Sequence, residues 1–181
     1  MTPAELLVEA FSRVPEVVGT AVVGLDDDQL AHRLDAEANS IAWLVWHLAR
    51  AQDAQVAPLA GQEQVWSEAG WRDRFDLPFA ADAMGYGHNS AEVGLVRAPA
   101  ELLLGYLTAV HERTVEYVQT VSEGDLNQVI DAGYDPPVTL GVRLVSVLDD
   151  CAQHAGQAAY VRGLIDRGAA ARSARPPGFL A

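Results

Sequence analysis

The chain has 181 residues, half of them hydrophobic, which is typical of one globular domain with a sizeable core. Its formal net charge is -13 and all 12 basic residues are arginine, which excludes Schiff-base lysine chemistry and argues against a nucleic-acid partner. The single cysteine excludes an intramolecular disulfide. Without a signal-peptide or membrane-spanning pattern, we expect a soluble cytoplasmic protein with no membrane partner.

A first amphipathic helix is predicted near the N-terminus. Thr2 can cap it, Pro3 suits its first turn, and Glu5 completes a capping box. Apolar residues at helical spacing continue past Pro15, which we expect to kink or restart the helix. Gly24 and the acidic residues after it should end the helix.

A second helix is predicted over residues 41–59, with Ser40 as its cap. One face of this helix is apolar except for a single polar residue, His47. The apolar members of that face are Trp43, Leu44, Ala51 and Ala54. The other polar residues are predicted to fall mainly on other faces: Arg50, Gln52, Asp53 and Gln55.

The segment 61–98 has poor periodicity and predicts a long ordered loop that folds over the domain. Its aromatic residues would pin it in place: Trp66, Trp71, Phe75, Phe79 and Tyr86. Ordered loops of this length are usually functional lids or binding loops. The most unusual piece is 85–90, Gly-Tyr-Gly-His-Asn-Ser, which contains His88.

Two further helices are predicted in the C-terminal half. Pro99 begins a third helix that extends to about residue 121, and Thr139 can cap a fourth that ends near residue 168. No strand pattern of useful length is present. We therefore expect an all-α fold, a four-helix bundle with one long crossover loop, as a single domain over residues 1–168. Residues 169–181 should form a flexible tail.

Asp150 and His154 are four residues apart in the apolar fourth helix, so both fall on one helix face. Burying an unpaired carboxylate is costly, which calls for a partner. With His47 from the second helix they could supply three metal ligands, two nitrogens and one oxygen. That set suits zinc, nickel or iron(II) and leaves coordination positions open. The spacing by itself is weak evidence.

The chain resembles the DinB-like superfamily, most closely its actinobacterial mycothiol-dependent branch. The resemblance extends from Leu6 to Asp166, and several segments carry it together. These are residues 40–49 (SIAWLVWHLA), 151–158 (CAQHAGQA), 162–166 (RGLID), 13–15 (RVP) and 85–88 (GYGH).

The resemblance implies an up-down-down-up bundle, often a dimer, with a divalent metal at a histidine triad. One ligand of that triad lies on the second helix and an H-x-x-x-H pair on the fourth, which places the ligands here at His47, Asp150 and His154. Asp150 departs from the pattern because many members have histidine there and others an acid. Several members use a low-molecular-weight thiol, mycothiol or bacillithiol.

Other interpretations of the candidate residues stay open. Asp149 is an alternative third ligand to Asp150. His88 is as well explained by capping the following segment as by a cofactor-binding role beside the pocket. Cys151 could be a nucleophile, although a lone cysteine on an apolar helix face is more often a core residue.

Three functions are compatible with the pattern. The first is a metal-dependent S-transferase or isomerase that uses mycothiol and a small-molecule electrophile. The second is a non-catalytic, dimeric bundle that binds metal or a small ligand. The third is a metal-dependent hydrolase, because a metal-bound hydroxide needs the same ligands. We expect a homodimer in each case.

Overall fold

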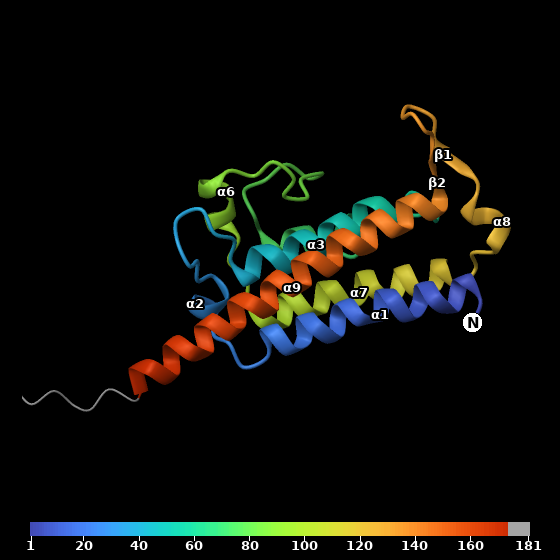
Figure 1. Ribbon diagram of the computed structural model, residues 1–181. Coiled ribbons are helices and arrows are strands. Elements are labelled where there is room, and N and C mark those ends of the chain that lie inside the picture. The colour runs from blue at the N-terminus through green and yellow to red at the C-terminus, as the bar shows by residue number, and fades with distance from the viewer. Residues whose placement is uncertain (174–181) are drawn as a thin grey trace, which may run out of the picture.

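The computed structural model describes residues 1–173, with side chains described to residue 168. Four long helices form the bundle, and Figure 1 shows them side by side: α1 (Pro3–Val22), α3 (Ile41–Val56), α7 (Ala100–Val118) and α9 (Leu140–Ser173). Followed by colour, α1 and α9 run in one direction and α3 and α7 in the other. Both α1 and α3 pack against α7 and α9, so that α1 and α3 lie across the diagonal of the bundle. The predicted all-α, up-down-down-up fold is confirmed.

Helix α1 begins as the sequence predicts. The Thr2 side chain accepts from the Glu5 backbone N–H at 3.1 Å, and the Glu5 carboxylate accepts from the Thr2 backbone N–H at 2.8 Å. The helix continues through Pro15 instead of restarting there. Phe11 and Val18, one on each side of the proline, are both fully buried, so core packing holds the helix across the missing N–H.

Helix α3 is the centre of the molecule. Ser40 caps it by accepting from the Trp43 N–H at 3.1 Å, and the helix ends at Val56, before the predicted residue 59. Every residue from 41 to 53 is buried, because α7 and α9 flank the helix and the segment 61–98 packs onto it. Arg50 and Asp53, which the sequence places on faces other than that of His47, are therefore buried as well.

The segment 61–98, called the covering segment below, contains short helices that the sequence analysis missed: α4 (Val65–Glu68), α5 (Trp71–Phe75) and α6 (Ser90–Leu95). Trp66, Trp71 and Phe75 are buried and surround the ring of Tyr106 on α7. The predicted aromatic anchoring is confirmed for these three residues and for Phe79, which packs on Trp46, but it is wrong for Tyr86, which is 92% exposed. The anchoring supplies the local order that periodicity alone did not indicate. A shorter connection between α1 and α3 contains α2 (Asp27–Leu30).

The connection between α7 and α9 also holds structure that was not predicted. It forms α8 (Glu123–Leu126) and a two-stranded antiparallel pair, β1 (Val129–Asp131) and β2 (Val138–Thr139). Thr139 caps α9, which runs to Ser173 and so passes the predicted end near residue 168. Of the expected tail, 169–173 are thus helical, and 174–181 lie outside the described residues. No helix in the described part of the chain is long and apolar enough to cross a membrane.

Candidate metal centre

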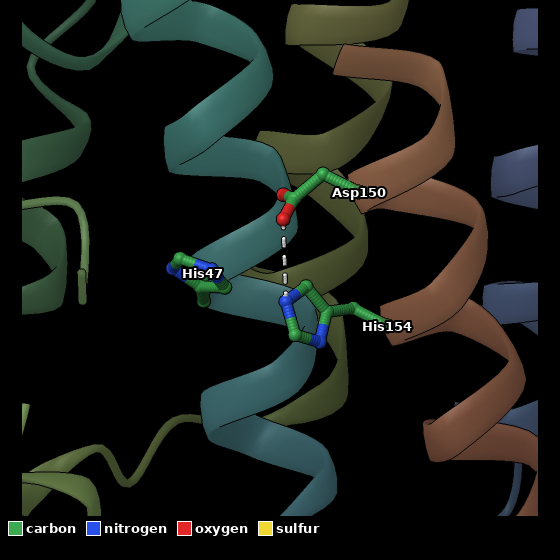
Figure 2. Close-up of side chains that lie close together, drawn as sticks. All are labelled: His47, Asp150 and His154. Carbon is green, nitrogen blue, oxygen red and sulfur yellow. Dashed lines mark ion pairs between the residues drawn. The ribbon is translucent and has the colours of Figure 1, made fainter. Parts of the chain in front are cut away.

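Three side chains from the neighbouring helices α3 and α9 come together, as Figure 2 shows: His47, Asp150 and His154. Each offers one ligand atom, and these atoms all lie within 4.8 Å of one another. We call this group the metal cluster. The sequence-predicted set is thus brought together. Asp149, the alternative, is exposed and its carboxylate accepts from Gln153 Nε2 at 2.8 Å, outside the cluster.

Both histidines of the metal cluster are oriented by hydrogen bonds on the ring nitrogen Nδ1. His47 Nδ1 bonds to the backbone carbonyl of Met84, and His154 Nδ1 lies 3.0 Å from Gln157 Oε1. Carbonyl oxygens can only accept, so each Nδ1 carries a proton. In neutral His47 this leaves the lone pair on Nε2, whereas His154 Nε2 faces the Asp150 carboxylate and must be free of its proton to bind a metal. In metal-binding histidines, the ring nitrogen that does not bind the metal commonly donates its proton to such a carbonyl acceptor, which fixes the ring orientation.

The spacing of the cluster suits a small divalent ion. A tetrahedral ion with ligand bonds of about 2.1 Å needs ligand atoms about 3.4 Å apart. His154 Nε2 and Asp150 Oδ1 lie 3.6 Å apart, and His47 completes a set that needs only modest contraction. The residues present therefore fit the metal that the resemblance implies.

The protonation of the cluster follows from burial and from its own hydrogen bonds. Burial lowers the pKa of His47, while the bond to Asp150 raises the pKa of His154. The same bond is the main cause that holds the pKa of Asp150 below its ordinary value. At neutral pH the cluster thus offers a carboxylate and a neutral His47, which are the ionisation states that ligation requires.

Gly85 explains why the Gly-Tyr-Gly piece of the covering segment is unusual. Its φ of 95° lies in the left-handed region, and a Cβ there would sit 2.8 Å from His47 Nδ1. The His47 ring is also stacked on Trp43, with the ring centroids 4.6 Å apart. Only glycine lets the backbone approach the histidine closely enough for the Met84 carbonyl to bond it.

The comparisons with known proteins assign the chain to a family. The family model described as mycothiol-S-transferase matches residues 6–167. The chain belongs to this family. The solved structure of a conserved protein from Enterococcus faecalis is similar at 32% identity, covering 91% of this chain and 98% of that one, with a TM-score of 0.85. A search of curated proteins finds no match.

Two other candidate functional residues, His88 and Cys151, lie outside the metal cluster. His88 is half-buried; its Nδ1 accepts from Trp43 Nε1 at 3.3 Å, and its ring packs against both Trp46 and Phe79. Its cofactor-binding role stays a prediction. Cys151 is fully buried, and burial raises the pKa of its thiol far above the ordinary value, so it serves as a core residue.

Sequence reasoning missed a second polar group on α3, formed by Arg50 and Asp53 with Tyr106 of α7. We call it the buried network. Asp53 accepts from the Tyr106 hydroxyl at 2.8 Å and from the backbone N–H groups of Val65 and Trp66 at 3.0 and 2.8 Å. The signal that could have revealed it is the i, i+3 pair of opposite charges inside an otherwise apolar helix.

A groove of about 600 Å³ opens beside the metal cluster, a volume within the range of small-molecule sites. Its lining includes Gln157, whose side chain hydrogen-bonds His154, and it continues along α3 and α9 toward Val161. Its lining is part apolar and part polar and includes no basic residue: Glu37, Ala38, Asn39, Leu44, Gln153, Gly156, Gln157, Tyr160 and Val161. A ligand in this groove would therefore lie next to the metal cluster.

Proposed function

We propose that this protein binds a divalent metal ion through His47, Asp150 and His154 and acts as a mycothiol-dependent S-transferase. The observation that carries the proposal is the pair of Nδ1-anchored histidines beside a carboxylate, within a chain of this family. Two nitrogens and one oxygen suit zinc, nickel and iron(II), which are the candidate metals. Three protein ligands leave a position open for substrate.

A divalent ion with an open position lowers the pKa of a thiol and so supplies a thiolate near neutral pH. The protein's own residues hold the ligand nitrogens in place through Met84 and Gln157. Asp150, which is 40% exposed, lies on the solvent side, where the thiol proton can leave to water. The sulfur lone pair then forms the new bond to a small electrophile, whose leaving group departs with its electron pair.

The groove beside the metal cluster is the proposed site for the body of the thiol. Its polar lining consists of amide, hydroxyl and carboxylate groups, which suit hydroxyl- and amide-bearing ligands better than an anionic thiol such as glutathione. Tyr160 is 66% exposed there and offers an aromatic face. Tyr160→Ala should raise KM for mycothiol and leave the metal content unchanged. An unchanged KM would place the thiol elsewhere.

The deciding experiment is metal analysis of protein purified without a histidine tag, followed by a conjugation assay with mycothiol and a model electrophile. We expect about one equivalent of metal and its loss in His154→Ala. His32→Ala is the matched control, because His32 is exposed and lies outside the cluster. Metal content far below one equivalent, or equal in the two variants, would reject the metal centre.

The assay also separates the proposed activity from its alternatives. Bound metal without conjugate above the metal-free background would favour a non-catalytic metal- or ligand-binding bundle. Hydrolysis that proceeds without thiol would favour a metal-dependent hydrolase. Isomerisation of a substrate with recovery of the thiol would favour an isomerase. The homodimer remains a prediction for light scattering.

A further inference from the structure

Arg50 is a fully buried arginine on α3, three residues after His47. Its guanidinium donates from Nε to the Ala83 carbonyl at 3.1 Å and from Nη1 to Gln64 Oε1 at 2.9 Å. Both acceptors belong to the covering segment. One side chain of the central helix therefore holds this segment at two points that are far apart in sequence.

The first of these points adjoins the metal cluster. Ala83 precedes Met84, whose carbonyl bonds His47 Nδ1, and Met84 precedes Gly85, which lies against the His47 ring. Three residues of α3 rise about 4.5 Å, and consecutive Cα atoms of the covering chain are about 3.8 Å apart. The carbonyls of Ala83 and Met84 therefore lie opposite two donors on successive turns of α3, Arg50 Nε and His47 Nδ1.

The position of Arg50 is itself fixed. Its Nη1 lies 3.6 Å from Asp53 Oδ2 and 3.3 Å from the Tyr106 hydroxyl, and its guanidinium carbon lies 4.8 Å from the centre of the Trp66 ring. A buried charge needs such compensation. The guanidinium is therefore held in one position, and its bond to Ala83 fixes the backbone of the covering segment relative to α3.

We propose that Arg50 is a positioning residue of the metal centre: by fixing Ala83, it places the Met84 carbonyl so that His47 keeps its proton on Nδ1 and presents Nε2 to the metal. This inference rests on the proposed metal-binding function. Residues that orient metal ligands in this way typically change metal affinity about 10- to 100-fold when altered.

The test compares the wild type with Arg50→Lys, which keeps the charge and loses the fork that reaches Ala83 and Gln64 together. Two quantities are measured: the zinc dissociation constant by chelator competition, and the tautomer of His47 by ¹⁵N NMR of the metal-free protein at pH 8. We expect zinc binding to weaken about 10- to 100-fold, and His47 to change from the Nδ1–H form to a mixture.

Thr114→Val is the matched control for a merely structural role. Thr114 is buried, its hydroxyl bonds Gln52 and the Val110 carbonyl, and none of these groups belongs to the covering segment. The variant should lower stability without changing the zinc affinity or the His47 tautomer. If it alters both as Arg50→Lys does, the positioning role is rejected.

A second variant guards against failure of Arg50→Lys to fold. Arg50→Met combined with Asp53→Asn leaves no unpaired buried charge and still removes the donor to Ala83. Wild-type affinity and a pure Nδ1–H form of His47 in either folded variant would overturn the inference. Absence of zinc binding by the wild type would reject the proposed function instead, and the tautomer would still test Arg50.

Discussion

Two polar groups occupy neighbouring turns of α3, and they differ in how completely their members bond one another. In the buried network, the Asp53 carboxylate has three hydrogen-bond donors. Arg50 is fully buried and donates from Nε and Nη1, while its Nη2 has no partner among the described residues. In the metal cluster, His154 Nε2 and Asp150 Oδ1 stand 3.6 Å apart and the Asp150 side chain is 40% exposed. A group whose members are closely bonded to one another holds structure together, whereas a partly exposed group of candidate ligand atoms is available for a metal.

The covering segment depends on both groups. Asp53 binds its beginning at Val65 and Trp66, and His47 binds it near its middle at Met84. The same segment that completes the fold therefore completes the orientation of a candidate ligand. Stability and metal affinity should respond differently when each group is altered.

The largest effect on stability is expected from Arg50→Ala. It leaves the Asp53 carboxylate buried without its cationic partner, and breaking a buried pair in this way costs about 3–5 kcal/mol. Urea denaturation of the metal-free protein measures the change. A loss below about 1 kcal/mol, as for surface ion pairs, would show that the two polar groups do not differ in the way described.

Asp150→Ala should strongly weaken zinc binding and have little effect on the stability of the metal-free protein. Zinc affinity should fall more than about 100-fold, beyond the usual effect of altering a group outside the ligand shell. The metal-free protein should lose less than about 1 kcal/mol, because the pair with His154 is partly exposed. Chelator competition and urea denaturation measure the two quantities. Asp149→Ala is the matched control and should keep full zinc affinity.

Gly85→Ala tests the contact between the covering segment and the metal cluster. The new Cβ would clash with His47 Nδ1. The alanine would also have to keep a φ of 95°, which costs about 1–3 kcal/mol. We expect zinc affinity to fall with stability, because the Met84 carbonyl must move. Gly87→Ala is the control: its φ is also positive, at 75°, but its Cβ would meet no atom within 4 Å. Equal losses of zinc affinity in both variants would remove the special role of Gly85.

The smallest effect concerns pH. Burial, and then the charge of Asp53, raise the pKa of Tyr106 well above its ordinary value of 10.0. Above that pH the unfolded chain loses this proton while the folded chain keeps it, so the stabilising contribution is present below pH 10 and declines as pH rises. The decline is about 1.4 kcal/mol per pH unit.

Tyr106→Phe removes this titration and isolates its effect. The stability difference between wild type and variant should shrink as pH rises from 9 to 11, measured by urea denaturation. A difference that stays constant over this range would contradict the assignment of the shift to Tyr106.

The sequence by itself determined the helical class and the capped starts at Thr2 and Ser40, and it named His47 and His154 as candidate ligands, with Asp150 or Asp149 as the third. It could do so because capping and a polar residue on an apolar helix face are local patterns. The family model matches residues 6–167, almost the same span as the resemblance from Leu6 to Asp166.

Only the tertiary structure decided which faces of α3 are buried. Periodicity assigns one inward face to a helix, but α3 is enclosed by α7, α9 and the covering segment together, so Arg50 and Asp53 became interior residues. The choice of Asp150 over Asp149 was likewise made by the rotation of α9 against α3. Both outcomes depend on contacts between residues far apart in sequence, which no local pattern encodes.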